Sequence, residues 1–143
     1  MNSIQTTISR ARVVAALAIG AAALLGAAAT AIAHGDDVHP VFSGALPNVP
    51  GKSLTAVVVN YAPGAKSETH HHAGSVFAYV LTGAIRSENS ATGAAKVYHV
   101  GESFFEPPGS IHLISENASA TEPASLLAVF VADDGATLTT VGK

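Results

Sequence analysis

The chain has 143 residues, contains no cysteine and carries a formal charge of −3 at pH 7. The absence of cysteine excludes a disulfide framework, a thiolate metal site and a cysteine nucleophile. Beyond residue 33 there are five basic residues against ten acidic ones, a formal charge of −5, so no nucleic-acid partner is expected.

Residues 1–33 have the pattern of a cleavable secretory signal peptide. Arg10 and Arg12 precede an apolar run over residues 13–29, and residues 31–33 form an A-x-A cleavage site. The alternative is a membrane anchor, but the run is short, rich in alanine and glycine, and has no basic stop-transfer flank. We therefore expect cleavage at this site, no stable membrane anchor, and a periplasmic or secreted protein.

After the signal, the chain predicts an extended arm followed by one small β domain. Residues 34–50 contain three prolines and few strand signals, which is typical of an extended N-terminal arm or edge segment. Residues 51–143 have the length of a single domain. Within them, apolar runs bounded by turn residues predict strands at Leu54–Tyr61, Val76–Leu81, Ala94–Val100, Ile111–Ser115 and Leu126–Val131. No segment after residue 33 keeps a 3.6-residue period, so the predicted fold class is all-β, as a sandwich or barrel.

Four histidines in two separate patches carry most of the functional information. His70, His71 and His72 follow a Pro-Gly turn, and His112 follows a Pro-Pro-Gly turn. Because side chains alternate across a strand, His70 and His72 face one way, with Glu68 on their side, and His71 faces the other way. Neutral imidazole is the commonest protein ligand for transition metals. The pattern predicts His70, His72 and His112 as metal ligands, and its alternative is a solvated polar turn.

The two patches together resemble the two motifs of the cupin superfamily. The first, G-x5-H-x-H-x3-E-x6-G, is matched by Gly64, His70, His72 and Gly83, with Val76 in the glutamate position. The second, G-x5-P-x-G-x2-H-x3-N, is matched by Gly101, Pro107, Gly109 and His112, with Asn117 one place late. The resemblance covers roughly residues 54–131 and implies a cupin-type double-stranded β-helix, or jelly roll.

The valine at position 76 is the main departure from that pattern. The cupin resemblance implies three histidines and a glutamate as ligands, and without the glutamate the two charges of a divalent ion are not compensated by protein. This favours an anionic substrate or a water-derived ligand on the metal. Alternatively another carboxylate substitutes, either Glu106 or Glu68. Glu106 is the better candidate, as a ligand, as a partner of a ligand, or as a catalytic residue that acts as a base or orients the substrate. Its alternative is a turn cap or a solvent-facing side chain.

These features predict a metal-dependent dioxygenase or other oxidoreductase. In lacking the motif glutamate, the chain resembles the cupins that cleave diketones or oxidise small thiols. We expect Fe(II), with Mn, Ni, Cu or Zn as alternatives, and a small chelating anionic substrate such as a β-dicarbonyl enolate. The competing hypothesis is a non-catalytic cupin that binds a metal or small ligand for sensing or sequestration, because the fold hosts both classes. A homodimer is expected only by analogy with the family.

Overall fold

The computed structural model describes residues 37–142. These residues form ten β-strands and no helix, so none of their segments is a helix that could cross a membrane. The predicted all-β class is therefore confirmed for this part of the chain. The predicted signal peptide, residues 1–33, lies outside the described residues.

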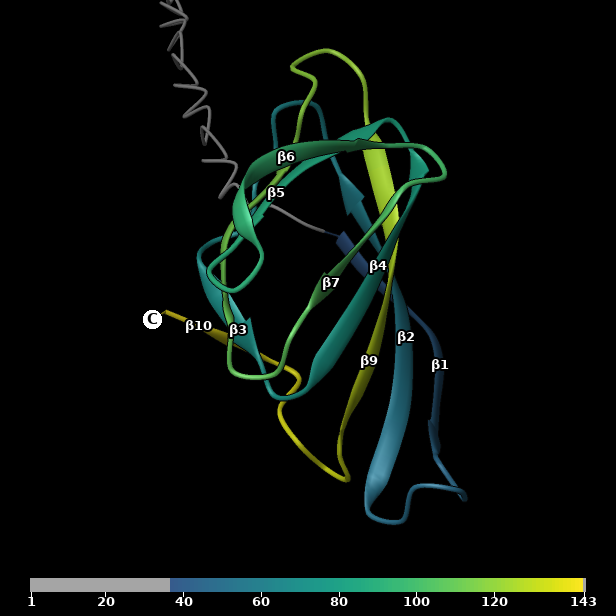
Figure 1. Cartoon of the computed structure of the whole chain (residues 1–143). Coiled ribbons are helices and arrows are strands. Elements are labelled where there is room, and N and C mark those ends of the chain that lie inside the picture. The colour runs from purple at the N-terminus through teal and green to yellow at the C-terminus, as the bar shows by residue number, and fades with distance from the viewer. Residues whose placement is uncertain (1–36, 143) are drawn as a thin grey trace, which may run out of the picture. The chain divides into compact units, whose positions relative to one another are not determined.

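The strands form two five-stranded antiparallel sheets, which face each other in Figure 1. In the first sheet the strand order is β1 (Asp37–Ala45), β2 (Lys52–Tyr61), β9 (Ala124–Asp133), β4 (Ser75–Thr82) and β7 (Ser103–Glu106). In the second sheet it is β10 (Thr139–Val141), β3 (His70–His72), β8 (Ile111–Asn117), β5 (Ala84–Asn89) and β6 (Gly93–His99). Apart from the pairs β1–β2 and β5–β6, successive strands alternate between the two sheets, as expected for a jelly roll.

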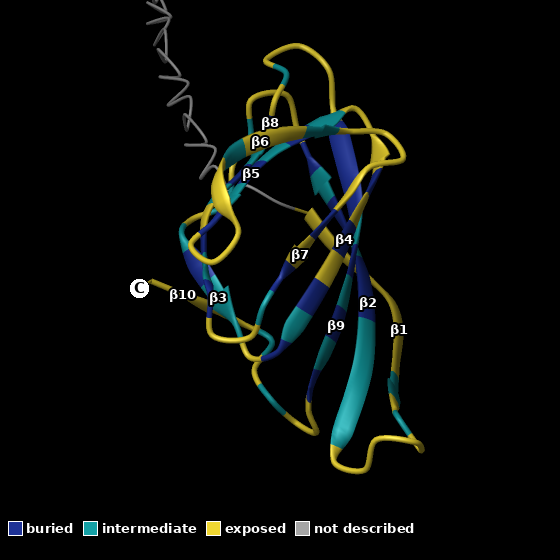
Figure 2. Ribbon diagram, in the orientation of Figure 1, coloured by how far each residue is buried: buried dark blue, intermediate teal, exposed yellow. Residues whose placement is uncertain are grey.

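The core lies between the two sheets and follows the two-residue period of the strands. On β4, Val76, Ala78 and Val80 are buried, whereas the residues between them are exposed, and Figure 2 shows this alternation along the strand. From the second sheet, Ile85 joins the same cluster. Complete burial of a valine or isoleucine side chain stabilises a fold by about 1.5–3 kcal/mol. The alternation therefore accounts for much of the driving force that brings the sheets together.

The five predicted strands all exist, as β2, β4, β6, β8 and β9, and the strand expected for the first histidine patch exists as β3. Strands β5, β7 and β10 were not predicted. Within the predicted arm, Asp37–Ala45 forms β1, the edge strand of the first sheet. The tight turn from β4 into β5 requires Gly83. Its φ is 66°, and a Cβ there would lie 2.6 Å from the carbonyl oxygen of Pro123, so a side chain would both clash and strain the backbone.

Candidate metal centre

The short strand β3 brings the two histidine patches together. It lies between β8 and β10, with His70 directly opposite His112 and His72 opposite Thr139. His70 and His72 face the interior as the alternation predicts, and His71 is not among the residues that line the cavity there. Gly109, with a φ of 74°, makes the turn that leads into β8. The predicted convergence of His70, His72 and His112 is therefore confirmed.

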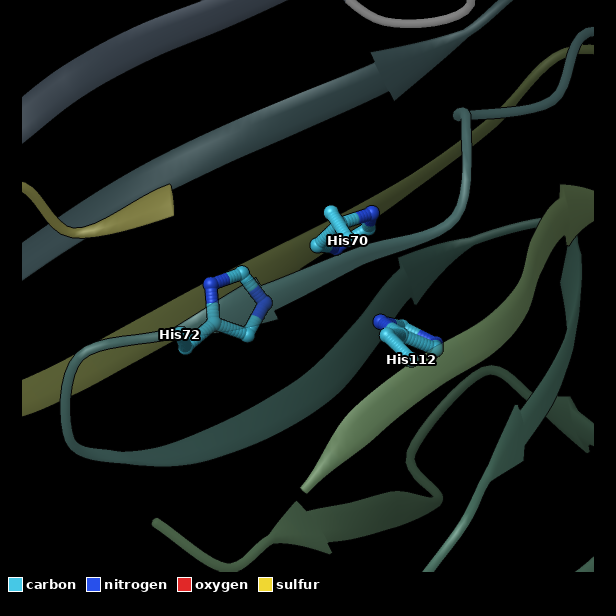
Figure 3. Close-up of side chains that lie close together, drawn as sticks. All are labelled: His70, His72 and His112. Atoms are coloured by element: carbon cyan, nitrogen blue, oxygen red, sulfur yellow. The ribbon is translucent and has the colours of Figure 1, made fainter. Parts of the chain in front are cut away.

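One ring nitrogen from each of these three histidines lies within 4.8 Å of the other two. Figure 3 shows the three rings grouped around a common space, two from β3 and one from β8. The ring centroid of His70 is 4.8 Å from that of His72 and 5.0 Å from that of His112. Side chains from segments about 40 residues apart in sequence thus meet at one point.

Hydrogen bonds fix which nitrogen of His70 and of His72 is available to a ligand. The Nδ1 atom of His70 donates to the carbonyl oxygen of Glu68 over 2.6 Å. The Nδ1 atom of His72 donates to the carbonyl oxygen of Leu138 over 3.1 Å. A carbonyl oxygen can only accept, so both Nδ1 atoms carry the proton and both Nε2 atoms keep a lone pair. This is the arrangement that orients histidine ligands in metal sites.

His112 is oriented from the opposite side of its ring. Its Nε2 lies 2.8 Å from the hydroxyl oxygen of Ser87, and donation to that oxygen leaves Nδ1 with a lone pair. Among the described residues, His112 Nδ1 is the single buried side-chain nitrogen or oxygen without a hydrogen-bond partner. Buried polar atoms are nearly always partnered. An atom without a partner at this point indicates a ligand that completes the site.

The carboxylate of Glu106 lies beside the histidines, on the face that it shares with Val76. On the first sheet Glu106 of β7 is directly opposite Val76 of β4, so the two side chains share the inner face. Its Oε2 atom lies 3.1 Å from His112 Nδ1 and 3.9 Å from His72 Nε2, and only 4% of its side chain is exposed. The 3.1 Å contact does not have hydrogen-bond geometry. Glu106 Oε2 and His112 Nδ1 therefore lie as two neighbouring ligands of one ion would lie.

The other carboxylate that could replace the missing glutamate, Glu68, lies outside this cluster. Its side chain is exposed and lines the cavity, while its backbone carbonyl oxygen orients His70. The structure therefore brings Glu106, and not Glu68, to the histidine nitrogens.

Two buried residues of β5 orient the site, and no local pattern in the sequence indicates them. Ser87 contacts His112, as described above, and Asn89 Nδ2 donates to Glu106 Oε2 over 3.2 Å and to Ser110 Oγ over 2.9 Å. The side-chain oxygen of Asn89 accepts from the backbone NH of Ala91. With all its polar atoms engaged, the Asn89 amide holds the Glu106 carboxyl in one orientation.

Burial sets the protonation states of the centre. It raises the pKa of Glu106 to about 7, against a smaller lowering by the Asn89 hydrogen bond. Burial, followed by the neighbouring His70, lowers the pKa of His72 to about 4 and that of His112 to about 3. At neutral pH these two imidazoles are therefore uncharged, as metal ligation requires, and their contacts with Glu106 are not ion pairs.

The spacing of the donors is compatible with a transition-metal ion. With ligand bonds of about 2.1 Å, neighbouring donors of a tetrahedral or octahedral ion are roughly 3.0–3.4 Å apart and opposite donors about 4.2 Å apart. The 3.1 Å distance from Glu106 Oε2 to His112 Nδ1 matches that of neighbouring donors, whereas the 3.9 Å distance to His72 Nε2 lies between the neighbouring and the opposite values. The histidine nitrogens, within 4.8 Å of one another, would have to approach by up to about 1.4 Å to be neighbouring ligands of one ion. The residues present, three imidazoles and one carboxylate, are donors of the kind that transition-metal ions bind.

The centre opens into a cavity of about 470 Å³ between the two sheets. Its walls are mainly apolar and include Val57, Val59, Ala78, Phe104, Leu126, Ala128 and Phe130. Its polar lining consists of the histidines, two carboxylates and the hydroxyls of Tyr61, Ser67, Ser115 and Thr139. No lysine or arginine occurs among the described residues that line it. The cavity therefore suits a small ligand with a chelating head and an apolar body.

Comparison with known proteins supports the predicted fold. The family model for the cupin domain (Cupin_2) matches residues 57–130. A search of curated proteins finds no significant match. Among solved structures, an uncharacterized conserved protein with a double-stranded beta-helix domain from Klebsiella pneumoniae is 19% identical, with a TM-score of 0.57, and the match covers 76% of this chain and 84% of that one.

Two enzymes share the same fold over a part of their length. DMSP lyase DddQ from Ruegeria pomeroyi is 20% identical, with a TM-score of 0.53, over 62% of this chain and 42% of that one. Oxalate decarboxylase from Bacillus subtilis, a protein with Mn(II) centers, is 26% identical, with a TM-score of 0.52, over 62% of this chain and 23% of that one. The match thus spans less than half of either enzyme.

Proposed function

This chain belongs to the cupin family, and we propose that it is a metal-dependent enzyme in which His70, His72, His112 and Glu106 hold a divalent ion. The observation that carries the proposal is the convergence of three histidine nitrogens on a buried point where His112 Nδ1 has no partner and a carboxylate oxygen lies 3.1 Å away. Imidazole and carboxylate together suit Fe(II), Mn(II) and Zn(II). We favour Fe(II) for oxygen chemistry, with Mn(II), the ion of the decarboxylase, as the nearest alternative.

The substrate that we propose is a small chelating monoanion with an apolar body. A second acidic group on the substrate would need a cationic partner, and the described lining of the cavity offers none. Apolar walls favour carbon chains or rings of modest size, given the volume of about 470 Å³. A β-dicarbonyl enolate meets these requirements, whereas a small dicarboxylate does not.

Glu106 allows such a substrate to bind without a change of net charge. The proton of the neutral dicarbonyl would pass to the Glu106 carboxylate, because burial raises the pKa of Glu106 to about 7 when no ion is bound and so favours the protonated carboxyl once it has left the ion. The resulting enolate then takes the place of the carboxylate beside His72 and His112. Asn89 keeps the protonated carboxyl in position. The apolar walls, among them Phe104 and Phe130, exclude water from the reacting carbon.

The reaction class that we propose is dioxygenation of the bound enolate. The metal ion, when bound, supplies Lewis-acid and redox chemistry. Dioxygenation of this kind cleaves a carbon–carbon bond of the dicarbonyl. Both atoms of dioxygen enter the two carbonyl products, and no external reductant is consumed. The lack of a cationic group in the described lining favours this class over reactions of dianionic substrates.

Elemental analysis of the exported protein, purified without chelator, tests the metal centre. We expect close to one transition-metal ion per chain, and its loss in His72→Ala. Oxygen uptake by the metal-loaded protein with a panel of enolisable and thiol substrates then tests the reaction. Absence of metal in both proteins, even after reconstitution, would refute the centre. Tight ligand binding without turnover would instead favour a cupin for sensing or sequestration.

We also propose that the protein is periplasmic or secreted, on the basis of the signal pattern in residues 1–33. N-terminal sequencing of the protein recovered from a bacterial periplasm or culture medium should then begin at His34. A protein that keeps its first residues and stays in the cytoplasm would contradict the proposal.

A further inference from the structure

A second group of polar side chains lines the cavity besides the metal centre. It consists of three hydroxyls, which belong to Tyr61 at the end of β2, Ser67 in the segment before β3, and Ser115 on β8. The Tyr61 hydroxyl oxygen lies 2.7 Å from Ser115 Oγ and 3.3 Å from Ser67 Oγ. Tyr61 and Ser115 are buried, and Ser67 is half-buried. We call these three residues the hydroxyl cluster.

The pairing that joins β3 to β8 also sets the distance between the hydroxyl cluster and the metal centre. His70 is directly opposite His112. Three residues from each of them, the backbone NH of Ser67 donates to the carbonyl oxygen of Ser115 over 2.8 Å. Three residues of extended chain span about 10 Å at most. The cavity therefore has two polar regions, separated by up to about 10 Å between the Cα atoms of the residues that form them.

A β-bulge in β8 turns Ser115 towards the cavity. In a regular strand, side chains three residues apart face opposite sides, so His112 and Ser115 would not both point inward. Two consecutive residues of β5 are opposite His112 and Ile114, so β8 has one extra residue, Leu113, at this point. Bulges re-aim side chains and are over-represented next to active sites. As a result, both His112 and Ser115 line the cavity.

Apolar side chains of the first sheet line the cavity between the two polar regions. Phe130 lies at the metal centre, where its ring centroid is 5.1 Å from that of His72. Ala128 and Leu126 follow on the same face of β9 and also line the cavity. Tyr61 is opposite the first residue of β9, which is one step further along that face. Along this wall the lining therefore changes from metal ligands to apolar side chains and then to hydroxyls.

The chemistry of the hydroxyl cluster favours a neutral oxygen group on the ligand. A hydroxyl donates one hydrogen bond and accepts two, so hydroxyls that contact one another can still bond to a ligand. A carboxylate tail would lose its hydration without a cationic partner, because no lysine or arginine occurs in the described lining of the cavity. An apolar tail would cover the hydroxyls with carbon and cost their hydration. A hydroxyl or carbonyl group on the ligand avoids both penalties.

We propose that the hydroxyl cluster is a second recognition site for the substrate, which binds a neutral oxygen group at the far end of the substrate's apolar body. This inference rests on the proposed function, because the metal centre holds the other end of the same molecule. The substrate is then a β-dicarbonyl enolate whose chain or ring ends in a hydroxyl or carbonyl group. Tyr61 and Ser115 determine specificity and take no part in the reaction at the metal.

Two ligands that differ only in their terminal group test the hydroxyl cluster. One is heptanoylacetone, a β-diketone with an unbranched alkyl tail, and the other is its analogue in which a hydroxyl replaces the terminal methyl group. Their dissociation constants are measured without oxygen on the Fe(II)-loaded protein, from the absorption band of the bound enolate. The hydroxyl-terminated ligand should bind at least as tightly as the methyl-terminated ligand, although it is the less hydrophobic of the two.

The variants Tyr61→Phe and Ser115→Ala each remove one hydroxyl and keep the rest of the side chain. In each of them the preference for the hydroxyl-terminated ligand over the methyl-terminated ligand should fall about 3- to 10-fold. A change in packing alone would weaken both ligands alike and leave this preference unchanged. The matched control is Ser125→Ala, which removes a buried hydroxyl that lies 2.8 Å from that of Thr82 and does not line the cavity. Its preference should be that of the wild type.

The possible failures of this experiment are distinguishable. A preference that neither Tyr61→Phe nor Ser115→Ala changes would overturn the hydroxyl cluster as a recognition site and leave the proposed metal-dependent function standing. Tighter binding of the methyl-terminated ligand by the wild type would have the same meaning. Failure of the Fe(II)-loaded protein to bind either ligand would instead refute the β-dicarbonyl substrate, and the present inference with it.

Discussion

Replacing Glu106 with glutamine removes the charge of the carboxylate while it keeps the size of the side chain and an oxygen that can accept from Asn89. If the carboxylate is a ligand, the variant should bind metal less tightly at pH 8. Loss of one ligand or its close partner typically lowers metal affinity by 10- to 100-fold. Affinity for Mn(II) or Co(II) can be measured by competition with a chelator of known affinity.

The pH dependence of this difference is the distinctive part of the prediction. Burial raises the pKa of Glu106 to about 7, so the metal-free protein keeps this proton below that pH and must release it on ligation. The affinity of the wild type should therefore fall by about tenfold per pH unit below 7 relative to the variant, which has no proton to lose. At pH 5.5 this amounts to a relative loss of roughly 30-fold. His72 and His112, with pKa values of about 4 and 3, remain neutral in both proteins.

Titrations from pH 5 to 8 on the wild type, Glu106→Gln and Glu68→Gln separate the possibilities. Glu68 is the matched control because it lines the same cavity but has an exposed side chain, and its variant should bind metal as the wild type does. A ratio of wild-type to Glu106→Gln affinities that stays constant over the whole pH range would refute ligation by the Glu106 carboxylate.

Three further predictions concern the surroundings of the centre. Glu106→Val should lose metal affinity, and adding Val76→Glu should restore it to within about tenfold, because the two positions are directly opposed on one face; no recovery in a chelator competition would argue against the shared position. Asn89→Ala should weaken metal binding by about 10-fold or more, since Glu106 loses its hydrogen bond, and unchanged affinity in the same assay would mean that Asn89 has only a structural role. In the Glu106→Gln background, the metal-free protein should lose roughly 2 kcal/mol of stability between pH 7 and 5.5, because His72 and His112 take up protons only when unfolded. Urea unfolding that shows equal stability at both pH values would contradict the buried, neutral state of these histidines.

Local pattern in the sequence determined the strands that are apolar and the side on which the histidines lie. The two-residue period places His70 and His72 on one face, and this depends only on the geometry of a strand. The spacing of the Gly, Pro and His residues was enough to indicate the cupin family and the convergence of His112. The short strands β7 and β10 were missed because three or four residues carry too little period to be distinguished from a loop.

Tertiary structure alone decided which carboxylate lies beside the histidines and which residues orient it. Glu106 lies close to the nitrogens of His72 and His112 because β7 pairs with β4 in a register that sets Glu106 opposite Val76. Asn89 reaches Glu106 because β5, in the other sheet, turns Ile85, Ser87 and Asn89 inward together. Because Arg86 and Glu88 lie between them, the sequence of this strand is mostly polar and resembles that of a loop. Such registers depend on how the two sheets pack over the whole domain, and no local spacing of residues encodes a contact made across that distance.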